Sequence, residues 1–220
     1  MDRDLTARLA EWSAPDTAEI PERLVGQVMP REGLWLRRAA RLVQPGKVIV
    51  EIGSYTGKST ACLAVGSAEG FGVPVHAVDL WTMGTSHKGG AFRAFDAASG
   101  EAQSTSKFHH PEVREKFTRR MAQYDRARLV VPHMGESTAV ARRWTGGPIG
   151  LLFIDGEHTY DGVRRDFQAW ARYVDGTVAF HDYGQKKNPE LLGVRQFVDQ
   201  LKGWQVVRLL ESMAIVERTA

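Results

Sequence analysis

Near-continuous apolar runs alternate along the chain with segments whose apolar residues recur at helical spacing. The run that begins at Val48 and those at residues 73–78, 149–154 and 178–180 consist mainly of apolar residues, many of them β-branched. Strands buried on both faces of a parallel sheet have this pattern. Residues 111–124 instead place apolar side chains four positions apart, which is typical of an amphipathic helix. The alternation predicts an α/β fold with a doubly wound, mostly parallel sheet.

The same patterns predict the remaining elements and the organisation of the chain. A Pro-Gly turn at residues 45–46 separates a helical N-terminal cap, residues 1–44, from a sheet-forming core, residues 46–218. Within the cap, residues 32–43 are amphipathic, and their leucines and alanines are expected to face inward. The other expected elements are strands at 129–131, 204–210 and 213–217, and helices that begin at Lys58 or span 138–144, 160–173 and 194–201. All of this fits a single domain, residues 1–220.

Residues 81–110 break these patterns. They are rich in glycine, serine, threonine and histidine and have weak periodicity. A long irregular segment inside a compact domain is usually a lid, a binding loop or disordered. Because this one follows the second strand, at the sheet edge where such folds bind ligands, we expect a lid over the ligand.

A glycine-containing turn links the first strand to the helix that follows it. Residues 51–59 read EIGSYTGKS, with Gly53 and Gly57 on either side of three turn residues. Glycine lets the backbone approach a ligand without a Cβ in the way. A strand, glycine turn and helix in this order form the nucleotide-binding corner of doubly wound sheets.

Three ligand classes compete for this corner. A nucleoside triphosphate would require a phosphate loop with a glycine at the position of Ile52, so the loop is one residue short. The glycine fingerprint of dinucleotide-binding folds is also absent, and the acidic Glu51 would repel a pyrophosphate. S-adenosylmethionine carries a sulfonium and an ammonium instead of phosphates. It therefore suits a turn that has a carboxylate beside it.

Two residues near the end of the second strand are candidates for nucleoside contacts. Asp79 ends that strand, where an acid is placed to accept the two ribose hydroxyls. The alternative is a solvated loop aspartate. Trp81 follows, and it is expected either to stack near the adenosine or to serve packing alone.

Two further strand ends carry acids that point to a metal. Asp155 follows the strand at 149–154, and Asp182 comes just after the strand at 178–180. Neighbouring strands lie about 5 Å apart, so the two carboxylates are expected to converge at one edge of the sheet. Carboxylates this close repel unless a cation lies between them, which favours Mg²⁺. His181 is a weaker ligand candidate, and its nitrogen favours a softer metal such as Mn²⁺.

These motifs together resemble the class I S-adenosylmethionine-dependent methyltransferases. The EIGSYTGKS stretch resembles their first motif, and IDGEHTYDGVRRDFQAW (154–170) and VAFHDY (178–183) follow in the family's order. The nearest subgroup is the small metal-dependent O-methyltransferases of sugars and small molecules, the macrocin-type enzymes. Relatives in this subgroup often have a second acid where this chain has His181. The resemblance covers residues 46–218 and implies a seven-stranded Rossmann-like sheet with an antiparallel last strand, and a homodimer.

The resemblance also implies functions for individual residues. His158, three residues after Asp155, would act as the general base that removes a proton from a sugar hydroxyl chelated by the metal. Its alternative is a structural role, capping the helix or pairing with Glu157. A turn after the third strand would border the adenine, although Ser137 could instead cap the next helix. The full set of expected cofactor contacts is Glu51, Gly53, Ser54, Tyr55, Gly57, Ser59, Asp79, Trp81, Gly135, Glu136, Ser137 and Asp155.

Composition limits the classes of ligand and the cellular compartment that fit this chain. The 220 residues carry a net charge of +3, which is too small to indicate nucleic-acid binding. No segment is long and apolar enough for a membrane span, and the single cysteine, Cys62, fits a reducing cytoplasm. The expected acceptor is a small molecule or an oligosaccharide, for example a mannoside or a methylated mannose oligosaccharide. Another hydroxylated metabolite such as a catechol, a non-catalytic nucleoside-binding module and a nucleotide hydrolase are the alternatives.

Overall fold

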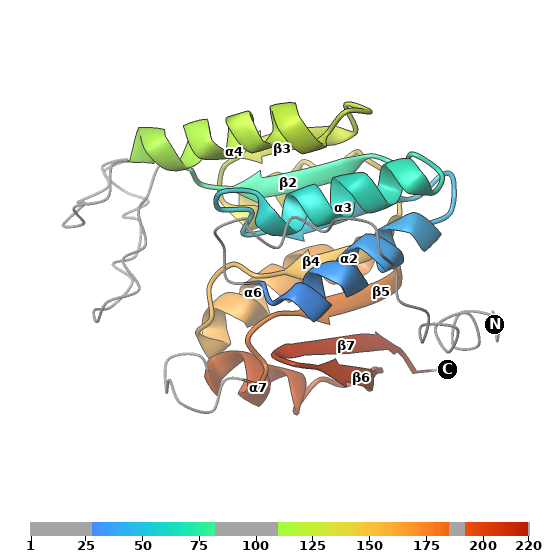
Figure 1. The fold of residues 1–220 in the computed structure, drawn as a ribbon. Coiled ribbons are helices and arrows are strands. Elements are labelled where there is room, and N and C mark those ends of the chain that lie inside the picture. The colour runs from blue at the N-terminus through green and yellow to red at the C-terminus, as the bar shows by residue number, and fades with distance from the viewer. Residues whose placement is uncertain (1–27, 82–109, 185–191, 220) are drawn as a thin grey trace.

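The structure, a computed structural model, describes residues 28–81, 110–184 and 192–219. These residues contain one seven-stranded sheet with the strand order β3-β2-β1-β4-β5-β7-β6 (Figure 1). Only β7 runs antiparallel to its neighbours, β5 and β6. The strands are β1 (Val48–Ile52), β2 (Val75–Asp79), β3 (Val130–Met134), β4 (Ile149–Ile154), β5 (Val174–Phe180), β6 (Trp204–Leu210) and β7 (Met213–Arg218). The predicted Rossmann-like sheet with an antiparallel last strand is confirmed.

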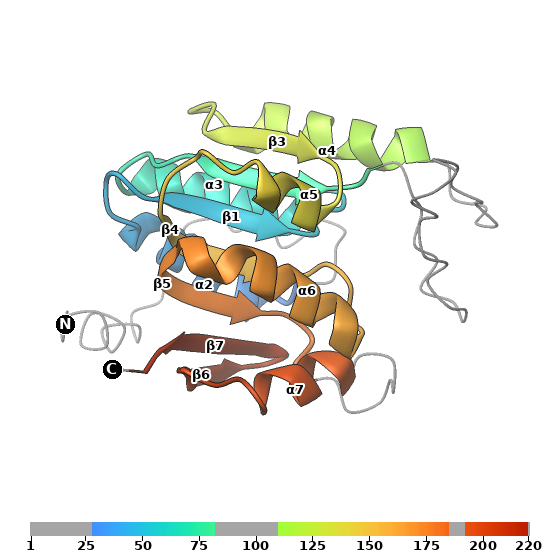
Figure 2. The same ribbon diagram turned by 180° about the vertical axis from the view of Figure 1, so that it is seen from behind.

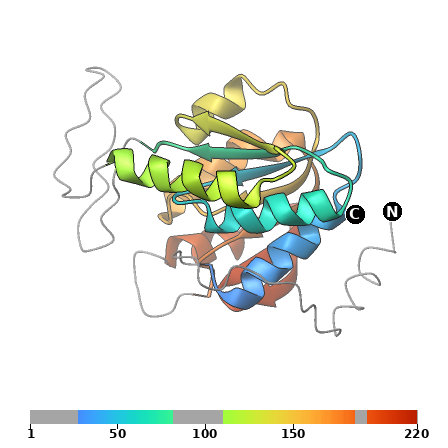
Figure 3. The same ribbon diagram turned by 45° about the horizontal axis from the view of Figure 1, so that its top comes forward.

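Helices cover both faces of the sheet. One face carries α2 (Pro30–Leu42), α3 (Lys58–Glu69) and α4 (His110–Tyr124), which Figure 3 shows as successive neighbours. The other face carries α5 (Ser137–Arg142), α6 (Tyr160–Trp170) and α7 (Leu192–Val198), seen from behind in Figure 2. A short 3₁₀ helix, Ala171–Tyr173, follows α6. The first 27 residues of the predicted cap and residues 82–109 of the predicted lid lie outside the described residues.

Apolar side chains fill the space between the sheet and each helical layer. Trp170 of α6 and Phe180 of β5 are fully buried on one side. Leu36 of α2 and Leu63 of α3 are fully buried on the other. Both layers therefore hold the sheet by burial of large side chains, as the apolar runs predict.

Strand pairing decides which side chains meet at the carboxyl edge. Ile52 of β1 pairs with Ile154 of β4, and Ile154 pairs with Phe180 of β5. The residues just beyond these partners therefore lie side by side. The amide of Asp155 donates to the carbonyl of Ile52, and the amide of His181 donates to the carbonyl of Ile154.

Several predicted boundaries differ from the structure by a few residues, and for two strands the physical reason is clear. The third strand was expected to end before Pro132, but β3 continues through it to Met134. Because β3 is an edge strand, the missing amide hydrogen of proline leaves no partner strand unsatisfied. The fifth strand begins at Val174 rather than at residue 178, because its polar first half still pairs with β4.

The helix α2 packs very closely on α3. A Cβ added to Gly66 of α3 would lie 2.0 Å from the carbonyl oxygen of Arg37, and one added to Gly70, the C-cap of α3, would lie 2.1 Å from that of Arg41. Arg37 also donates from Nε to a carboxylate oxygen of Glu69, at 2.8 Å. The inner face of α2 was expected to be apolar. It does bury Trp35 and Leu36, but it also buries Glu32 and Arg37.

The central strand β1 carries a carboxylate with no exposed surface, that of Glu51. The hydroxyls of Ser59 and Thr60, in the first turn of α3, hydrogen bond to it. Burial raises the pKa of Glu51 to about 7, against the opposing effect of these hydroxyls. The carboxylate thus faces the start of α3, where the helix dipole partly offsets its charge.

This arrangement predicts a pH-dependent difference in stability between the wild type and Glu51→Gln. Since the pKa rises from 4.5 to about 7 on folding, the folded state binds the proton more tightly, so this group's contribution to the free energy of unfolding is lost as the pH rises from 4.5 through about 7. The free energy of unfolding of the variant, relative to wild type, should rise by up to about 3 kcal/mol between pH 4.5 and 8. Urea denaturation at several pH values measures it.

Thr60→Val is the matched control, because it keeps the carboxylate and removes one hydrogen-bond donor from it. Its unfolding free energy should fall more steeply with pH than that of wild type. A Glu51→Gln difference that is constant over this range would show that Glu51 does not titrate near neutrality.

Candidate active site

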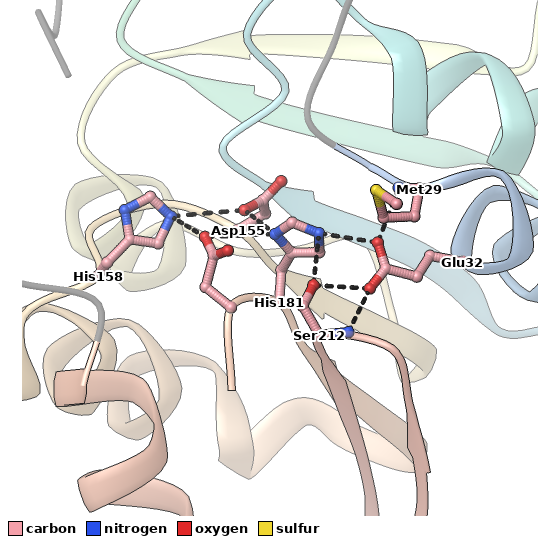
Figure 4. Close-up of polar contacts among 7 residues, drawn as sticks. Met29, Glu32, Asp155, His158, His181 and Ser212 are labelled. Carbon is pink, nitrogen blue, oxygen red and sulfur yellow. Dashed lines mark hydrogen bonds and ion pairs between the residues drawn. The ribbon is translucent and has the colours of Figure 1, made fainter. Parts of the chain in front are cut away.

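Three ionisable side chains meet beyond the carboxyl ends of β4 and β5. Asp155 follows β4, Asp182 comes after β5, and His158 lies in the turn that leads into α6. Nε2 of His158 is 2.9 Å from Oδ2 of Asp182 and 3.6 Å from Oδ1 of Asp155. One ligand atom from each residue lies within 4.8 Å of the others, a spacing suited to a metal ion (Figure 4). The predicted convergence of the two acids is present.

His181, directly after β5, lies behind this group and is almost fully buried. Its Nδ1 is 3.1 Å from Oδ1 of Asp155 and 3.3 Å from Oδ2 of Asp182. Its Nε2 faces the opposite way and lies 3.1 Å from Oε2 of Glu32. The imidazole thus bridges the two aspartates and a third carboxylate, from α2 (Figure 4).

Glu32 is the site residue that the sequence analysis missed. It has no exposed surface and lies 149 residues before His181 in the chain. One oxygen accepts the amide and hydroxyl hydrogens of Ser212, and the other accepts the amide hydrogen of Met29. The sequence did contain a signal for it. Glu32 stands three residues after Met29, at the capping-box position of a helix, and shares its buried face with Trp35 and Leu36.

The charges of these groups shift one another's pKa values. Burial alone would raise the pKa values of Asp155 and Asp182, but the two imidazoles lower both below the ordinary range. Burial would likewise lower the pKa of His158, yet its contacts with Asp155 and Asp182 raise it to about 9. The pKa of His181 is raised well above its usual value in the same way. The pKa of Glu32 is lowered by His181 and Ser212 despite burial.

The donor atoms fit a divalent cation. Nδ1 of His181 and Oδ2 of Asp182 are buried, and in the described ranges their neighbours are the charged groups of this cluster. Two buried carboxylates this close to each other need compensating positive charge, which either protonated imidazoles or a cation held between the carboxylates would supply. Two carboxylates with neighbouring imidazole nitrogens are a ligand set found in metal sites.

The glycine turn lies directly against this group. Gly53 has a φ of +88°, and a Cβ there would lie 2.1 Å from the carbonyl oxygen of Asp155. Gly57 has a φ of +83° and precedes the first residue of α3. A Cβ on it would lie 2.9 Å from side-chain atoms of Phe117 and Met121 of α4. The spacing of the two glycines thus reflects close approach by β4 on one side and by α4 on the other.

Asp79 holds two turns together. Its carboxylate accepts the amide hydrogens of Tyr55, at 2.8 Å, and Trp81, at 2.7 Å. The indole of Trp81 donates to the carbonyl of Tyr55 and packs on Phe117. Burial raises the pKa of Asp79, against these amide hydrogen bonds. Carboxylate oxygens have further lone pairs, so ribose binding by Asp79 stays a prediction, as does stacking of Trp81 on adenosine.

Two residues after β3 are held by different neighbours: Gly135 bonds to the end of β2, and Ser137 bonds to α6. The amide of Gly135 donates to the carbonyl of Asp79, which keeps this turn at the sheet edge. Ser137 is the first residue of α5, and its hydroxyl accepts from the indole of Trp170. The alternative role for Ser137 as a helix cap is wrong, since Glu136 occupies the cap position.

Among the other predicted cofactor contacts, Ser54 and Ser59 are buried and Tyr55 is exposed.

No helix among the described residues has the length and apolar character needed to cross a membrane.

Known structures of low sequence identity share the fold. The O-methyltransferase TomG from Streptomyces achromogenes, in complex with S-adenosylmethionine, has a TM-score of 0.58 and 17% identity, covering 91% of this chain and 83% of that one. The O-methyltransferase NovP has a TM-score of 0.62 and 16% identity, covering 87% and 81%. An O-methyltransferase from Bacillus cereus, in complex with S-adenosylhomocysteine, has a TM-score of 0.56 and 16% identity, covering 96% of both.

A family comparison extends this result from fold to activity. A family model described as a methyltransferase domain matches residues 50–183. The match runs from β1 to the residues after β5 and therefore includes the glycine turn, both aspartates and both histidines of the site. Because it spans more than half of the 220 residues, the chain belongs to the methyltransferase domain family, and the expectation of a methyl-transferring enzyme is confirmed.

Proposed function

We propose that this methyltransferase moves a methyl group from S-adenosylmethionine to a hydroxyl oxygen of a small-molecule acceptor, with the help of a divalent cation. The observation that carries the proposal is the group of Asp155, His158 and Asp182, within 4.8 Å of one another and against the Gly53 turn. The similar structures of O-methyltransferases with bound S-adenosylmethionine or S-adenosylhomocysteine support it.

The turn residues would receive the cofactor. S-adenosylmethionine supplies a methyl group that its sulfonium makes electrophilic. Gly53, without a Cβ, leaves the backbone open to close approach, and Asp79 keeps the turns at Tyr55 and Trp81 in fixed positions. Positioning of this kind contributes much of the rate in a displacement between two bound reactants.

Asp155 and Asp182 would hold the cation, which when bound lowers the pKa of an acceptor hydroxyl. His158 would remove the hydroxyl proton at Nε2. Its pKa of about 9 is caused by the two aspartates, after the opposing effect of burial. With a cation on the same carboxylates that cause would be removed, so the pKa of His158 would return toward its ordinary range and the imidazole could accept a proton at neutral pH.

For the acceptor we propose a sugar with two adjacent hydroxyls, a mannoside being the first candidate. The support is the sequence resemblance to macrocin-type sugar O-methyltransferases at residues 154–170 and 178–183. A catechol offers the same pair of adjacent oxygens on a flat ring and is the second candidate. A direct assay distinguishes the two candidates: S-adenosylhomocysteine release is measured with α-methyl mannoside as the acceptor and then with catechol.

The first prediction concerns the cofactor. S-adenosylhomocysteine should raise the thermal unfolding midpoint, while ATP and NAD should not, because the turn lacks the glycine spacing of phosphate-binding loops. At about 100 times its dissociation constant, a ligand specific for the folded state adds about 2.7 kcal/mol. A shift with Mg-ATP and none with S-adenosylhomocysteine would contradict the proposal.

The second prediction concerns the base. His158→Ala should lower turnover at least about 100-fold, because a positioned acid–base group typically contributes that much. S-adenosylhomocysteine affinity should stay unchanged, and added imidazole should restore part of the rate. Asp161→Asn, three residues further on and exposed, is the matched control with wild-type turnover. Near wild-type turnover in His158→Ala would rule out the base assignment.

A further inference from the structure

The buried Glu32 determines which nitrogen of His181 carries a hydrogen. An ionised carboxylate can only accept hydrogen bonds, and Oε2 of Glu32 lies 3.1 Å from Nε2 of His181. The hydroxyl of Ser212 is 3.3 Å from the same nitrogen, and its own hydrogen is donated to Glu32. Both neighbours of Nε2 therefore present lone pairs, and Nε2 must be the protonated nitrogen of a neutral ring.

When a cation replaces the second ring proton, the other nitrogen, Nδ1, turns its lone pair toward the acids. Nδ1 of His181 lies 3.1 Å from Oδ1 of Asp155 and 3.3 Å from Oδ2 of Asp182. A nitrogen lone pair beside two carboxylates is repelled by them unless a cation lies among the three atoms.

We propose that Glu32 is a positioning residue that makes His181 the nitrogen ligand of the metal held by Asp155 and Asp182. This inference rests on the metal dependence in the proposed function. A carboxylate that accepts the second ring N–H of a metal-bound histidine fixes its orientation and increases its basicity. His158, whose Nε2 faces the same carboxylates, is then left for the acceptor's proton.

The position of Glu32 is fixed from three directions. Met29 and Ser212 donate three hydrogen bonds to its carboxylate. The helix that carries it packs on α3 so closely that Gly66 leaves no room for a Cβ beside Arg37. The β6–β7 turn supplies Ser212, so α2 and the C-terminal hairpin both contribute to orienting one imidazole.

The nitrogen ligand selects the type of metal. Mg²⁺ prefers oxygen ligands and binds imidazole poorly, whereas first-row transition cations accept imidazole with carboxylate. The site should therefore bind Mn²⁺ more tightly than Mg²⁺, and His181→Asn should reduce that preference by weakening Mn²⁺ binding.

The experiment uses Mn²⁺ with the full-length protein, in the presence of S-adenosylhomocysteine and without turnover. Electron paramagnetic resonance measures the affinity, and pulsed measurements detect a directly bound imidazole nitrogen. Wild type and His158→Asn should both show the nitrogen signal, and His181→Asn should lose it. Glu32→Gln should weaken Mn²⁺ binding about 10- to 100-fold. Its amide group would turn a donor toward Nε2 and favour the tautomer with the hydrogen on Nδ1.

Two variants control for loosening of the N-terminal helix. Glu69→Gln weakens the contact between α2 and α3 without touching His181, so it should bind Mn²⁺ like wild type. Ser212→Ala removes one donor to Glu32 and should weaken binding less than Glu32→Gln, which keeps the test available if that variant fails to fold.

Several outcomes would overturn the inference. A nitrogen signal that is lost in His158→Asn and kept in His181→Asn would make His158 the ligand. Wild-type Mn²⁺ affinity in Glu32→Gln would remove the positioning role. Absence of Mn²⁺ binding to a wild-type protein that binds S-adenosylhomocysteine would end both this inference and the metal dependence. Absence of S-adenosylhomocysteine binding would instead end the proposed function itself.

Discussion

Burial of charge at one sheet edge is the constraint that organises this molecule. Glu32, Asp155, Asp182, His158 and His181 meet with little access to water. Buried charges cost several kcal/mol each unless partners compensate them. The compensation comes from segments far apart in the chain, namely the ends of β4 and β5, the start of α2 and the β6–β7 turn. The fold therefore has to be complete before the site is stable.

The register of the parallel strands brings the charged residues of this site together. Because Ile52, Ile154 and Phe180 are partners across three neighbouring strands, the polar residues that follow them share one edge. Gly53 then brings the first turn against the carbonyl of Asp155, where any side chain would collide. The glycine turn and the acidic group are therefore one structural unit, as the proposed metal-assisted methyl transfer requires.

Much of this arrangement could be predicted from the sequence, because it follows from local rules. Apolar runs give strands, and acids at strand ends converge at an edge, so Asp155 and Asp182 were placed together without a structure. The boundary of β3 at Pro132 was wrong because the rule against proline in strands depends on position in the sheet, which composition does not reveal.

Glu32 could not be found in the same way. Its partner His181 is 149 residues away, and no periodicity links a helix cap to a strand end. An acid on an amphipathic helix is usually solvated, and only the packing of α2 on α3 turns this one inward. Asp79 illustrates the opposite case: it ends β2 as predicted, but its hydrogen bonds to two backbone amides give it a structural task that its position alone does not suggest.

Charge balance connects the acids, the histidines and the cation. Three carboxylates face two imidazoles, and they raise the pKa values of His158 and His181, which favours rings that hold protons and neutralise the acids. A divalent cation among the same carboxylates supplies the same two positive charges. Ring protons and cation are therefore alternatives, since both together would overcompensate a buried site. In the proposed mechanism His158 gains from this exchange, because the cation would remove the reason for the ring to be protonated before it receives the acceptor's proton. The contact between Glu32 and His181 makes the exchange unequal for the two rings: His181 would exchange its Nδ1 hydrogen for the cation and keep its Nε2 hydrogen toward Glu32, which leaves His158 as the ring that can take up a proton beside the cation.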